Sequence, residues 1–329
     1  MEYTTIADTG IKTSRVGLGT WAIGGWMWGG TDEAQSINTI QSAIEREITL
    51  VDTAPVYGFG RSEEIVGRAL KNIDRDSFVL ATKVGLEWKD GTPYRNGTRE
   101  RIMREIDDSL KRLQVDYIDI YQVHWPDPLV DIKETAAAMN ELYEGGKIKA
   151  VGVSNFSPEQ MDYFRSASPL HTCQPPYNLF ERDIEHKLIP YCKRNNISLI
   201  TYGGLCRGML SGKMEKNREF KGDDLRKQDP KFKEPRFSQY LDAVNRLDEM
   251  VNKKYGRRII HLALRWLQQK GSDIPLWGAR RPDQLDPVDN IDGWEIEPED
   301  MIEIEQILLD SIKDPVGPEF MSPPDRSSR

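Results

Sequence analysis

The chain has 329 residues, of which 38% are hydrophobic and 30% are charged, a composition typical of a globular protein with a large buried core. Its formal net charge of −8 argues against the basic surface that nucleic acids and anionic membranes attract. No apolar run approaches the ~20 residues that span a bilayer, and the N-terminus lacks the features of a secretory signal, so we expect a cytoplasmic protein that binds neither nucleic acid nor membrane.

Cysteine and histidine usage bears on metal and redox chemistry. Cys173, Cys192 and Cys206 are too few and too far apart in the sequence for a disulfide framework or a metal knuckle. The four histidines include no pair at the spacing of metal ligands. We therefore expect three reduced thiols and no metal site.

The N-terminal residues predict a polar hairpin over residues 3–15, followed by a strand at residues 16–20. Residues 17–22, Gly-Leu-Gly-Thr-Trp-Ala, formally match the glycine fingerprint of a dinucleotide-binding Rossmann fold. That fingerprint must open directly into a helix. Because further glycines fill residues 24–30, we expect no helix before Thr31 and reject the match.

From residue 32 onward, short apolar runs alternate with amphipathic segments. Helical periodicity is clear where Ile102, Ile106 and Leu110 recur on one face. The predicted strands cover residues 48–51, 78–82, 117–123, 148–153, 172–174, 197–201 and 274–278. The predicted helices cover residues 32–46, 62–70, 98–113, 132–144, 184–195, 237–254 and 258–270, with one more opening at a capping box in residues 157–160.

Two segments stand apart from this alternation. Residues 213–236 are charged and punctuated by proline, so we expect a surface excursion there, and the tail from Asp314 should be irregular. No linker or change of composition divides the chain. We therefore predict one domain over residues 1–329, a (β/α)8 TIM barrel of eight parallel strands with an N-terminal β-hairpin and extra C-terminal helices. The alternative, a doubly wound open sheet, is disfavoured by the even spacing and the missing fingerprint.

Three predicted strands end in polar residues that can carry chemistry. Asp52 closes the first of them and Tyr57 lies in the loop that follows, while Lys83 and His124 close the next two. Each residue alone has an ordinary explanation, as a turn carboxylate, a packing aromatic, a solvated charge or a structural histidine. Together they map to the C-terminal rim of one barrel, where the active sites of such barrels lie.

These four groups suit the reduction of a carbonyl. An ammonium beside a phenol lowers the phenol pKa from its usual value near ~10, so we expect Lys83 to acidify Tyr57. Asp52 would supply the counter-ion of a buried lysine, and a neutral His124 would donate a hydrogen bond to a carbonyl oxygen. Such a set can protonate an oxygen while hydride reaches the adjacent carbon. Glu63, at a predicted helix start, is explained instead by the helix dipole.

A series of short motifs from about Tyr3 to Pro324 resembles the aldo-keto reductases, and within them the bacterial general-stress branch. Two stretches carry the likeness to that branch, Trp-Ala-Ile-Gly-Gly and Asp-Pro-Val-Gly-Pro-Glu-Phe. The motifs of the wider family occur in this order: Gly-Leu-Gly-Thr-Trp, Val-Asp-Thr-Ala-Pro-Val-Tyr-Gly, Ala-Thr-Lys, Gln-Val-His-Trp-Pro-Asp, Gly-Val-Ser-Asn-Phe-Ser, Gln-Pro-Pro-Tyr-Asn and Leu-Cys-Arg-Gly-Met-Leu-Ser-Gly-Lys.

The resemblance implies that Asp52, Tyr57, Lys83 and His124 form a catalytic tetrad with Tyr57 as the general acid. It also implies NADPH bound in an extended form across the rim, without a Rossmann fold. The residues that would surround its nicotinamide and pyrophosphate are Thr20, Trp21, Asp52, Ser154, Asn155, Gln174, Tyr202, Gly203, Leu205, Cys206 and Arg207. Lys213 and Arg226 would add charge at the pyrophosphate, and the residues nearer the adenosine phosphate would be Arg280, Arg281 and Gln284.

Parts of this implied site stay open. Lys213 and Arg226 could equally belong to a solvated loop. The acid-Asn pair usual in the family is replaced by Pro287-Val288, so the adenine end departs from the pattern. Aromatic loop residues would contact an apolar aldehyde or ketone, or simply pack the barrel mouth; they are Trp21 and Trp125, with Trp26, Trp28 and Trp88.

We therefore predict an NADPH-dependent carbonyl reductase that converts aldehydes or ketones to alcohols, with a small-molecule substrate and no partner protein. The alternative is a slow-turnover, NADPH-sensing interaction protein resembling the potassium-channel beta subunits of the same superfamily. A barrel hydrolase is a third possibility, and it would bind no nucleotide.

Overall fold

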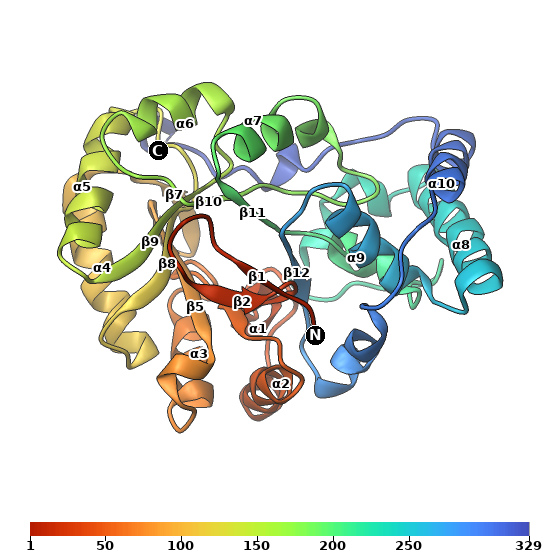
Figure 1. Cartoon of the computed structure of the whole chain (residues 1–329), viewed down its shortest axis with the longest axis horizontal. Coiled ribbons are helices and arrows are strands. Elements are labelled where there is room, and N and C mark those ends of the chain that lie inside the picture. Colours follow the sequence, from red (N-terminus) through yellow and green to blue (C-terminus); the bar gives the residue numbers. More distant parts are fainter. Residues whose placement is uncertain (329) are drawn as a thin grey trace.

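The centre of the computed structural model, which describes residues 1–328, is a closed barrel of eight parallel strands (Figure 1). Strand β12 pairs with β3 and closes the ring, so the predicted TIM barrel is confirmed and the open sheet is excluded. In chain order the strands are β3 (Gly17–Gly19), β4 (Leu50–Asp52), β5 (Val79–Val84), β8 (Ile118–Val123), β9 (Ile148–Ser154), β10 (Thr172–Gln174), β11 (Ser198–Thr201) and β12 (Ile274–Gly278).

Strand alternation divides the core into two layers. Val79 and Ala81 of β5 pack in a small buried cluster with Leu50 of β4 and Ile120 of β8. Leu80, between them in sequence, belongs to the larger cluster that lies under the surrounding helices. Because side chains alternate along a strand, Lys83, two positions beyond Ala81, also faces the barrel axis. This periodicity directs Lys83 into the barrel mouth.

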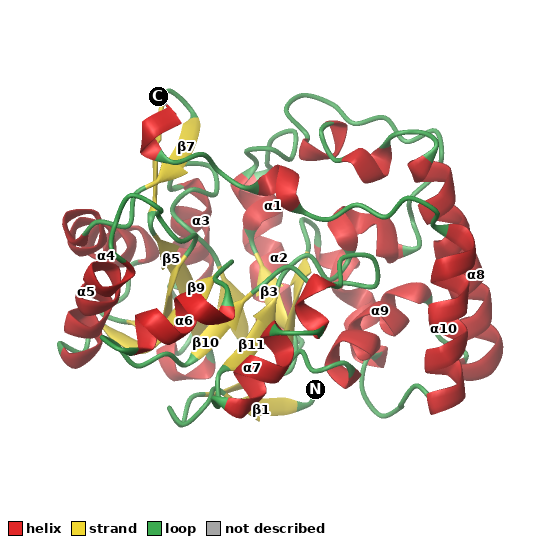
Figure 2. Ribbon diagram, turned by 90° about the horizontal axis from the view of Figure 1, so that it is seen from above, coloured by secondary structure: helices red, strands yellow, loops and turns green. Residues whose placement is uncertain are grey.

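Helices surround the barrel and two antiparallel hairpins lie at its ends (Figure 2). The predicted N-terminal hairpin, β1 (Tyr3–Thr5) with β2 (Lys12–Ser14), is confirmed, and Ile6 beside it packs into the floor of the barrel. The predicted capping box is also confirmed, with Ser157 and Gln160 bonded reciprocally. The helices are α2 (Glu33–Glu45), α3 (Arg61–Leu70), α4 (Arg99–Leu113), α5 (Ile132–Glu144), α6 (Pro158–Arg165), α7 (Leu188–Arg194), α8 (Arg236–Tyr255), α9 (Ile259–Gln269) and α10 (Pro298–Ser311).

Two elements differ from the expectations. A short helix, α1 (Trp21–Gly24), begins where no helix was expected before Thr31, because the glycine run allows one turn and Gly25, at φ +80°, ends it. The segment after β5 adds a second hairpin that the sequence did not predict, β6 (Leu86–Lys89) with β7 (Thr92–Arg95). The rejection of a Rossmann turn nevertheless stands, since α1 is one turn long.

The expectation of a surface excursion at residues 213–236 is wrong for its second half. Asp229 and Lys231 are fully buried, and they pair with Arg207 and Glu181, which lie elsewhere in the sequence. Buried charges are tolerated only with such partners. The C-terminal tail is irregular apart from short 3-10 turns, and it is also anchored, because Arg326 bonds to buried Asp127. That residues 1–329 form one domain stays a prediction.

A buried ionic network ties α3 to α4 beneath the barrel rim. Glu63 is fully buried and accepts hydrogen bonds from Thr82 Oγ1 and from Arg112 Nε, each at 2.6 Å. Arg112 also contacts Glu105, which pairs with Arg101. The helix dipole alone therefore does not account for Glu63.

Replacing Arg112 with alanine should lower the free energy of unfolding by about 3 kcal/mol, since it leaves the Glu63 carboxylate buried without its cation. Urea denaturation followed by circular dichroism measures this. The matched control is Arg99→Ala on the same helix, which removes an exposed pair with Glu141 and should change stability by no more than about 0.5 kcal/mol. Equal losses in the two variants would contradict the role given to the buried network.

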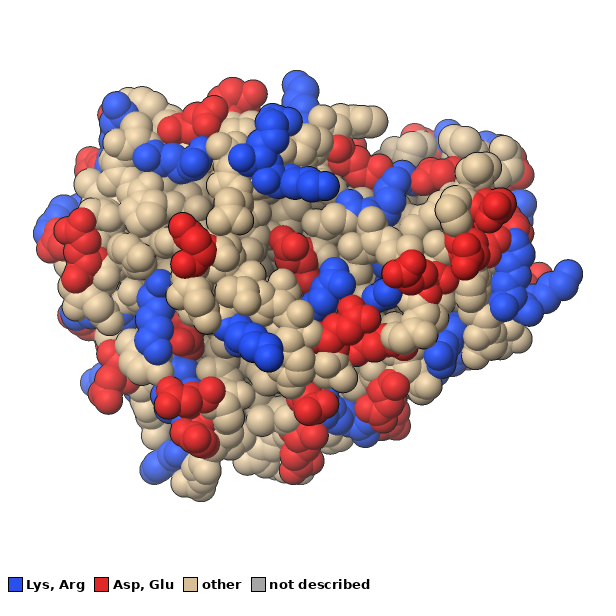
Figure 3. Space-filling view, in the orientation of Figure 1, with Lys and Arg blue, Asp and Glu red and all other residues tan. Residues whose placement is uncertain are grey.

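The surface carries no single-sign field on the face drawn in Figure 3, where acidic and basic side chains are interspersed. Among residues 1–328, no helix combines the length and apolar character that crossing a bilayer requires. Residence in the cytoplasm stays a prediction.

Candidate active site

The C-terminal ends of three strands bring the predicted tetrad together at the barrel mouth. Asp52 ends β4, Lys83 lies in β5 and His124 follows β8, with the His124 amide donating to the Val84 carbonyl at 2.7 Å. Tyr57 lies in the turn after β4. Its loop packs directly on α1, because Gly58, at φ +69°, has no Cβ that would strike the Gly24 carbonyl.

Lys83 Nζ is the hub of this cluster. It donates to Asp52 Oδ1 at 2.5 Å, to the Thr53 carbonyl at 3.0 Å and to the Tyr57 hydroxyl at 3.2 Å. Asp52 and Lys83 are almost fully buried, whereas Tyr57 is half-buried at the edge of the mouth. A buried ion pair thus holds a phenol hydroxyl at the opening, where a substrate can reach it.

His124 approaches the phenol from the side. The two ring centroids are 5.8 Å apart at an interplanar angle of 82°. Burial, and then the charge of Lys83, hold the pKa of His124 well below its usual value. The imidazole is therefore neutral at pH 7, as expected, and can offer one N–H to an oxygen placed beside Tyr57.

The expected acidification of Tyr57 is wrong for this arrangement. Burial, and then the Asp52 carboxylate, raise the pKa of Tyr57 well above its usual value. Burial is the main physical reason, and Lys83 does not offset it because its ammonium lies closer to Asp52 than to Tyr57. Tyr57 consequently keeps its proton at neutral pH, which a proton donor requires.

The depressed pKa of His124 has a measurable consequence. Its imidazole proton resonance should stay constant from pH 8 down through about pH 6.5, where a free histidine titrates. Because only the unfolded chain takes up this proton near pH ~6.5, His124 lowers the free energy of unfolding as the pH falls below that value. Nuclear magnetic resonance titration measures the first effect, and a His124 midpoint between pH 6 and 7 would contradict the assignment.

The polar residues implied for the nicotinamide lie together on the next strands. Ser154 Oγ donates to the Gln174 carbonyl at 2.7 Å, and Asn155 Nδ2 donates to the His124 carbonyl at 3.0 Å. The Tyr202 hydroxyl donates to Asn155 Oδ1 at 2.9 Å, which fixes the plane of its ring. The residues that the resemblance assigns to the nicotinamide are therefore joined by one chain of hydrogen bonds that begins at the His124 carbonyl.

Gln174 and Gln122 both donate to Asp52 Oδ2, at 2.8 Å and 3.2 Å. The amide nitrogen of Gln174 is therefore turned toward the tetrad. Gln122 was missed by the sequence analysis, because a glutamine inside an apolar strand gives no chemical signal by itself. Its position two residues before His124 is the only pattern that could have pointed to it.

The loop after β11 has the backbone shape of an anion cradle. Cys206, Arg207 and Gly208 have consecutive positive φ values of 44°, 53° and 91°, a left-handed run that turns successive peptide groups toward one side. The Arg207 side chain is buried beneath this run, between Glu181 and Asp229. Burial raises the pKa of the Cys206 thiol to about 12, so this cysteine stays protonated at neutral pH.

Cations flank this loop, and most already have protein partners. Arg226 forms an ion pair with Asp224 and lies over the ring of Trp28. Arg280 donates to the carbonyls of Trp28 and Gly30, and it therefore holds the loop that contains these two residues. The remaining members of the expected set are Arg281, exposed and paired with Asp283; Gln284, which caps the backbone of Arg280 and Arg281; and Lys213, which is exposed.

Aromatic side chains line the mouth beside Tyr57. Trp21 stacks on the Tyr57 ring at a centroid distance of 5.9 Å, and its indole N–H has no hydrogen-bond partner among the described residues. Trp125 and Tyr57 pack against the same buried cluster of Ala54, Val56 and Leu86, and the Trp125 ring lies under the guanidinium of Arg95. The Thr20 hydroxyl instead points into the protein and bonds to the Asp52 carbonyl at 2.9 Å. Trp26 and Trp88 pack on Phe59.

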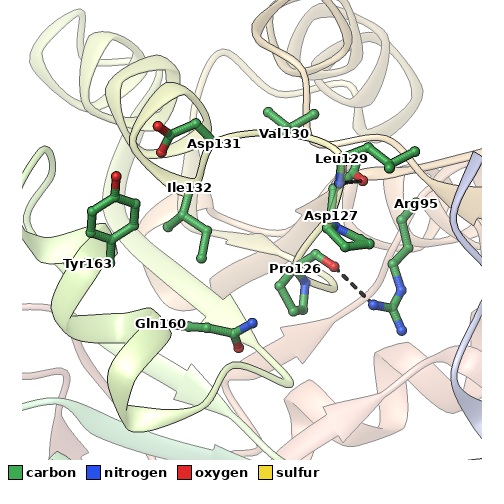
Figure 4. Close-up of a pocket in the computed structure, with 10 residues that line it drawn as sticks. Arg95, Pro126, Asp127, Leu129, Val130, Asp131, Ile132, Gln160 and Tyr163 are labelled. Atoms are coloured by element: carbon green, nitrogen blue, oxygen red, sulfur yellow. Dashed lines mark hydrogen bonds between the residues drawn. The ribbon is translucent and has the colours of Figure 1, made fainter.

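A cavity of about 500 Å³ lies beside the loop that follows His124 (Figure 4). It is formed by the loop after His124, by Tyr163 and Gln160 of α6, and by Arg95, which donates to the Pro126 carbonyl. No tetrad residue lines it. Within residues 1–328, no group of three or more His, Cys, Asp or Glu side chains could hold a metal ion.

Comparison with known proteins shows which family the chain resembles. Residues 15–309 match the model of the aldo/keto reductase family. The chain is 61% identical to the aldo-keto reductase YhdN of Bacillus subtilis (strain 168), over 99% of each protein. It is 36% identical to the NADH-specific methylglyoxal reductase of Escherichia coli (strain K12), over 87% of this chain and 91% of the relative.

A solved structure gives the same result. The glycerol dehydrogenase AKR11B4 from Gluconobacter oxydans superposes with a TM-score of 0.88 at 45% identity, covering 97% of this chain and 99% of the other. The match in sequence and the match in fold extend over nearly the whole chain. The protein described here therefore belongs to the aldo/keto reductase family, whose enzymes are oxidoreductases acting on small-molecule carbonyl substrates.

Proposed function

We propose that this protein is an NADPH-dependent carbonyl reductase that converts an aldehyde or a ketone to an alcohol, with Tyr57 as the general acid. The observation that carries the proposal is the 3.2 Å contact between Lys83 Nζ and the Tyr57 hydroxyl at the open end of the barrel. A protonated phenol, a buried cation and a neutral imidazole there meet the needs of a carbonyl oxygen that gains negative charge.

The proton transfer can be followed through the residues of the chain. His124 donates a hydrogen bond that orients the substrate oxygen beside Tyr57. As that oxygen gains negative charge, Tyr57 gives it the hydroxyl proton and becomes a phenolate. Lys83 then stabilises the phenolate, while Asp52 keeps the lysine charged. A reduced nicotinamide, when bound, supplies the hydride for the carbon.

The residues present fit such a coenzyme. The left-handed run at residues 206–208 offers a backbone cradle for a diphosphate. Tyr202 and Asn155 form a fixed polar and aromatic pair beside His124, suited to a nicotinamide ring and its carboxamide. Ser154 and Gln174 complete that side, and Gly203, Leu205, Cys206 and Arg207 would contribute main-chain contacts. Thr20 and Trp21 would border the nicotinamide near Tyr57.

Arg281 is the group we assign to the 2′-phosphate of NADPH. Its side chain is exposed and, among the described residues, forms its ion pair with the neighbouring Asp283, so a phosphate can replace Asp283 as the partner of the guanidinium at little cost. Arg280, Arg226, Lys213 and Gln284 would support it. The preference for NADPH needs its own test, because the methylglyoxal reductase relative is NADH-specific.

Replacing Arg281 with alanine should lower kcat/KM for NADPH by about 10-fold or more, since a charge-assisted bond to phosphate is lost. The value for NADH should change little. Steady-state kinetics with both coenzymes measures the ratio. Arg194→Ala, which removes an exposed arginine at the end of α7, serves as the control. If the ratio of kcat/KM for NADPH to kcat/KM for NADH were unchanged in Arg281→Ala, Arg281 would not be the residue that binds the 2′-phosphate.

The activity itself is tested by absorbance at 340 nm. Purified protein with NADPH and an aromatic aldehyde should consume the coenzyme, and a panel of aldehydes and ketones with both coenzymes defines its range. Copurification of a partner protein with negligible turnover would instead favour the sensing alternative. The relatives described above are reductases and a dehydrogenase, so they lend that alternative no support. A link to the stress response stays a prediction.

A further inference from the structure

Gln122 occupies a central place in the barrel that the proposed mechanism does not use. In the sheet it lies opposite Lys83 of β5 on one side and opposite Gly152 of β9 on the other. Gly152 leaves room for it, since a Cβ there would be 2.7 Å from Gln122 Cγ. The side chain is fully buried, so the sheet directs a polar amide into the interior just below the tetrad.

The amide of Gln122 meets the far side of the Asp52 carboxylate. Asp52 Oδ1 accepts from Lys83 Nζ at 2.5 Å, while Oδ2 accepts from Gln122 Nε2 at 3.2 Å and from Gln174 Nε2 at 2.8 Å. The two glutamines also contact each other at 3.4 Å. One carboxylate oxygen is thus held by a cation, and the other by two neutral donors.

A short buried lysine–carboxylate pair can lose its charges by moving one proton. If the proton passes from Nζ to Oδ1, both groups become neutral, and Tyr57 loses the ammonium beside it. Hydrogen bonds to Oδ2 favour the ionised carboxylate and oppose that transfer. Neutral amides do so without adding a charge that would cancel the lysine.

We propose that Gln122 is a positioning residue, whose amide keeps Asp52 ionised and thereby keeps the charged Lys83 against the Tyr57 hydroxyl. This inference rests on the proposed function. Gln174 shares the contact, but its position beside Ser154 also suits it to the coenzyme, so Gln122 is the residue through which the effect can be tested alone. The charged or titratable groups facing it are Asp52 from β4, Lys83 from β5 and His124 from its own segment; Glu63 lies on the outer side of β5.

The first test is Gln122→Leu, which keeps most of the volume and removes the donor. We expect kcat to fall by about 10-fold or more, as for loss of a hydrogen bond to a charged group, while the dissociation constant of NADPH, followed by protein fluorescence, stays within about twofold of wild type. The matched control is Thr172→Val on β10, a buried residue whose hydroxyl has no partner among the described residues. Its kcat should be unchanged.

The second test is Gln122→Glu, which distinguishes a hydrogen-bonding role from simple packing. A protonated glutamic acid can donate to Asp52 as the amide does, whereas the ionised form repels it. The kcat of this variant should therefore fall as the pH rises through one carboxyl titration, a step absent from the wild-type profile. The variant also replaces the leucine test if Gln122→Leu fails to fold.

The outcomes separate the two proposals. Wild-type turnover together with a Gln122→Leu variant of unchanged kcat, or a Gln122→Glu variant without the extra titration step, would overturn the role of Gln122 alone. A wild-type protein that oxidises no NADPH with any carbonyl compound would overturn the proposed function, and this inference with it.

Discussion

Replacing Tyr57 with phenylalanine is expected to lower kcat for carbonyl reduction by about 10²- to 10⁴-fold, the usual contribution of a general acid. Phenylalanine keeps the ring that stacks on Trp21 and packs against His124, so only the proton and its contact with Lys83 are lost. NADPH binding should therefore persist. Single-turnover measurements at 340 nm, with a separate binding titration, distinguish these two effects.

A second tyrosine provides the control for Tyr57. The Tyr121 hydroxyl is buried on the outer face of β8 and has no hydrogen-bond partner among the described residues. Tyr121→Phe also removes one buried phenol oxygen, yet it should leave turnover unchanged. If Tyr57→Phe retained wild-type activity, the proton would have to come from another group, and the role given to Tyr57 would be wrong.

The Lys83→Met variant should lose both activity and stability. Methionine has a similar length but no charge, so the Asp52 carboxylate stays buried with only two amide donors on Oδ2. Removing one partner of a buried ion pair typically costs about 3–5 kcal/mol. We therefore expect the free energy of unfolding to fall by roughly that amount and turnover to fall below detection, as measured by urea denaturation and by the 340 nm assay.

A double variant separates the two losses. Asp52→Asn combined with Lys83→Met removes both charges, so no uncompensated ion remains in the barrel. Most of the lost stability should return, because a buried pair replaced as a unit is often nearly neutral. Activity should stay absent, since no cation is left beside Tyr57. Recovered turnover in the double variant would contradict the part assigned to Lys83.

Much of the fold was predictable because it depends on local periodicity. Apolar runs such as the one that ends at Asp52, and helical stripes such as Ile102 and Ile106, occur where the structure has β4 and α4. Parallel strands with helical crossovers place all their C-terminal ends on one rim. For that reason Asp52, Lys83 and His124 could be assigned to one site before any distance was known.

Other features depend on partners that lie far away along the chain. Nothing local marks Asp229 and Lys231 as buried, because their neutralising partners Glu181 and Arg207 come from other loops. The small helix α1 was missed for a different, local reason, since glycine weakens a helix without forbidding one turn. Local sequence therefore misjudges segments whose conformation is set by long-range pairing.

The sequence by itself determined the barrel, its order of strands and which side chains reach the mouth, since alternation and connection length are local properties. Only the tertiary structure decided the electrostatics. Closing the barrel buried the phenol and placed Lys83 nearer to Asp52 than to Tyr57, so the phenol pKa rises instead of falling. It also set Gln122 against Asp52, because an amide acquires a role only when a charge from a distant strand lies within hydrogen-bonding distance.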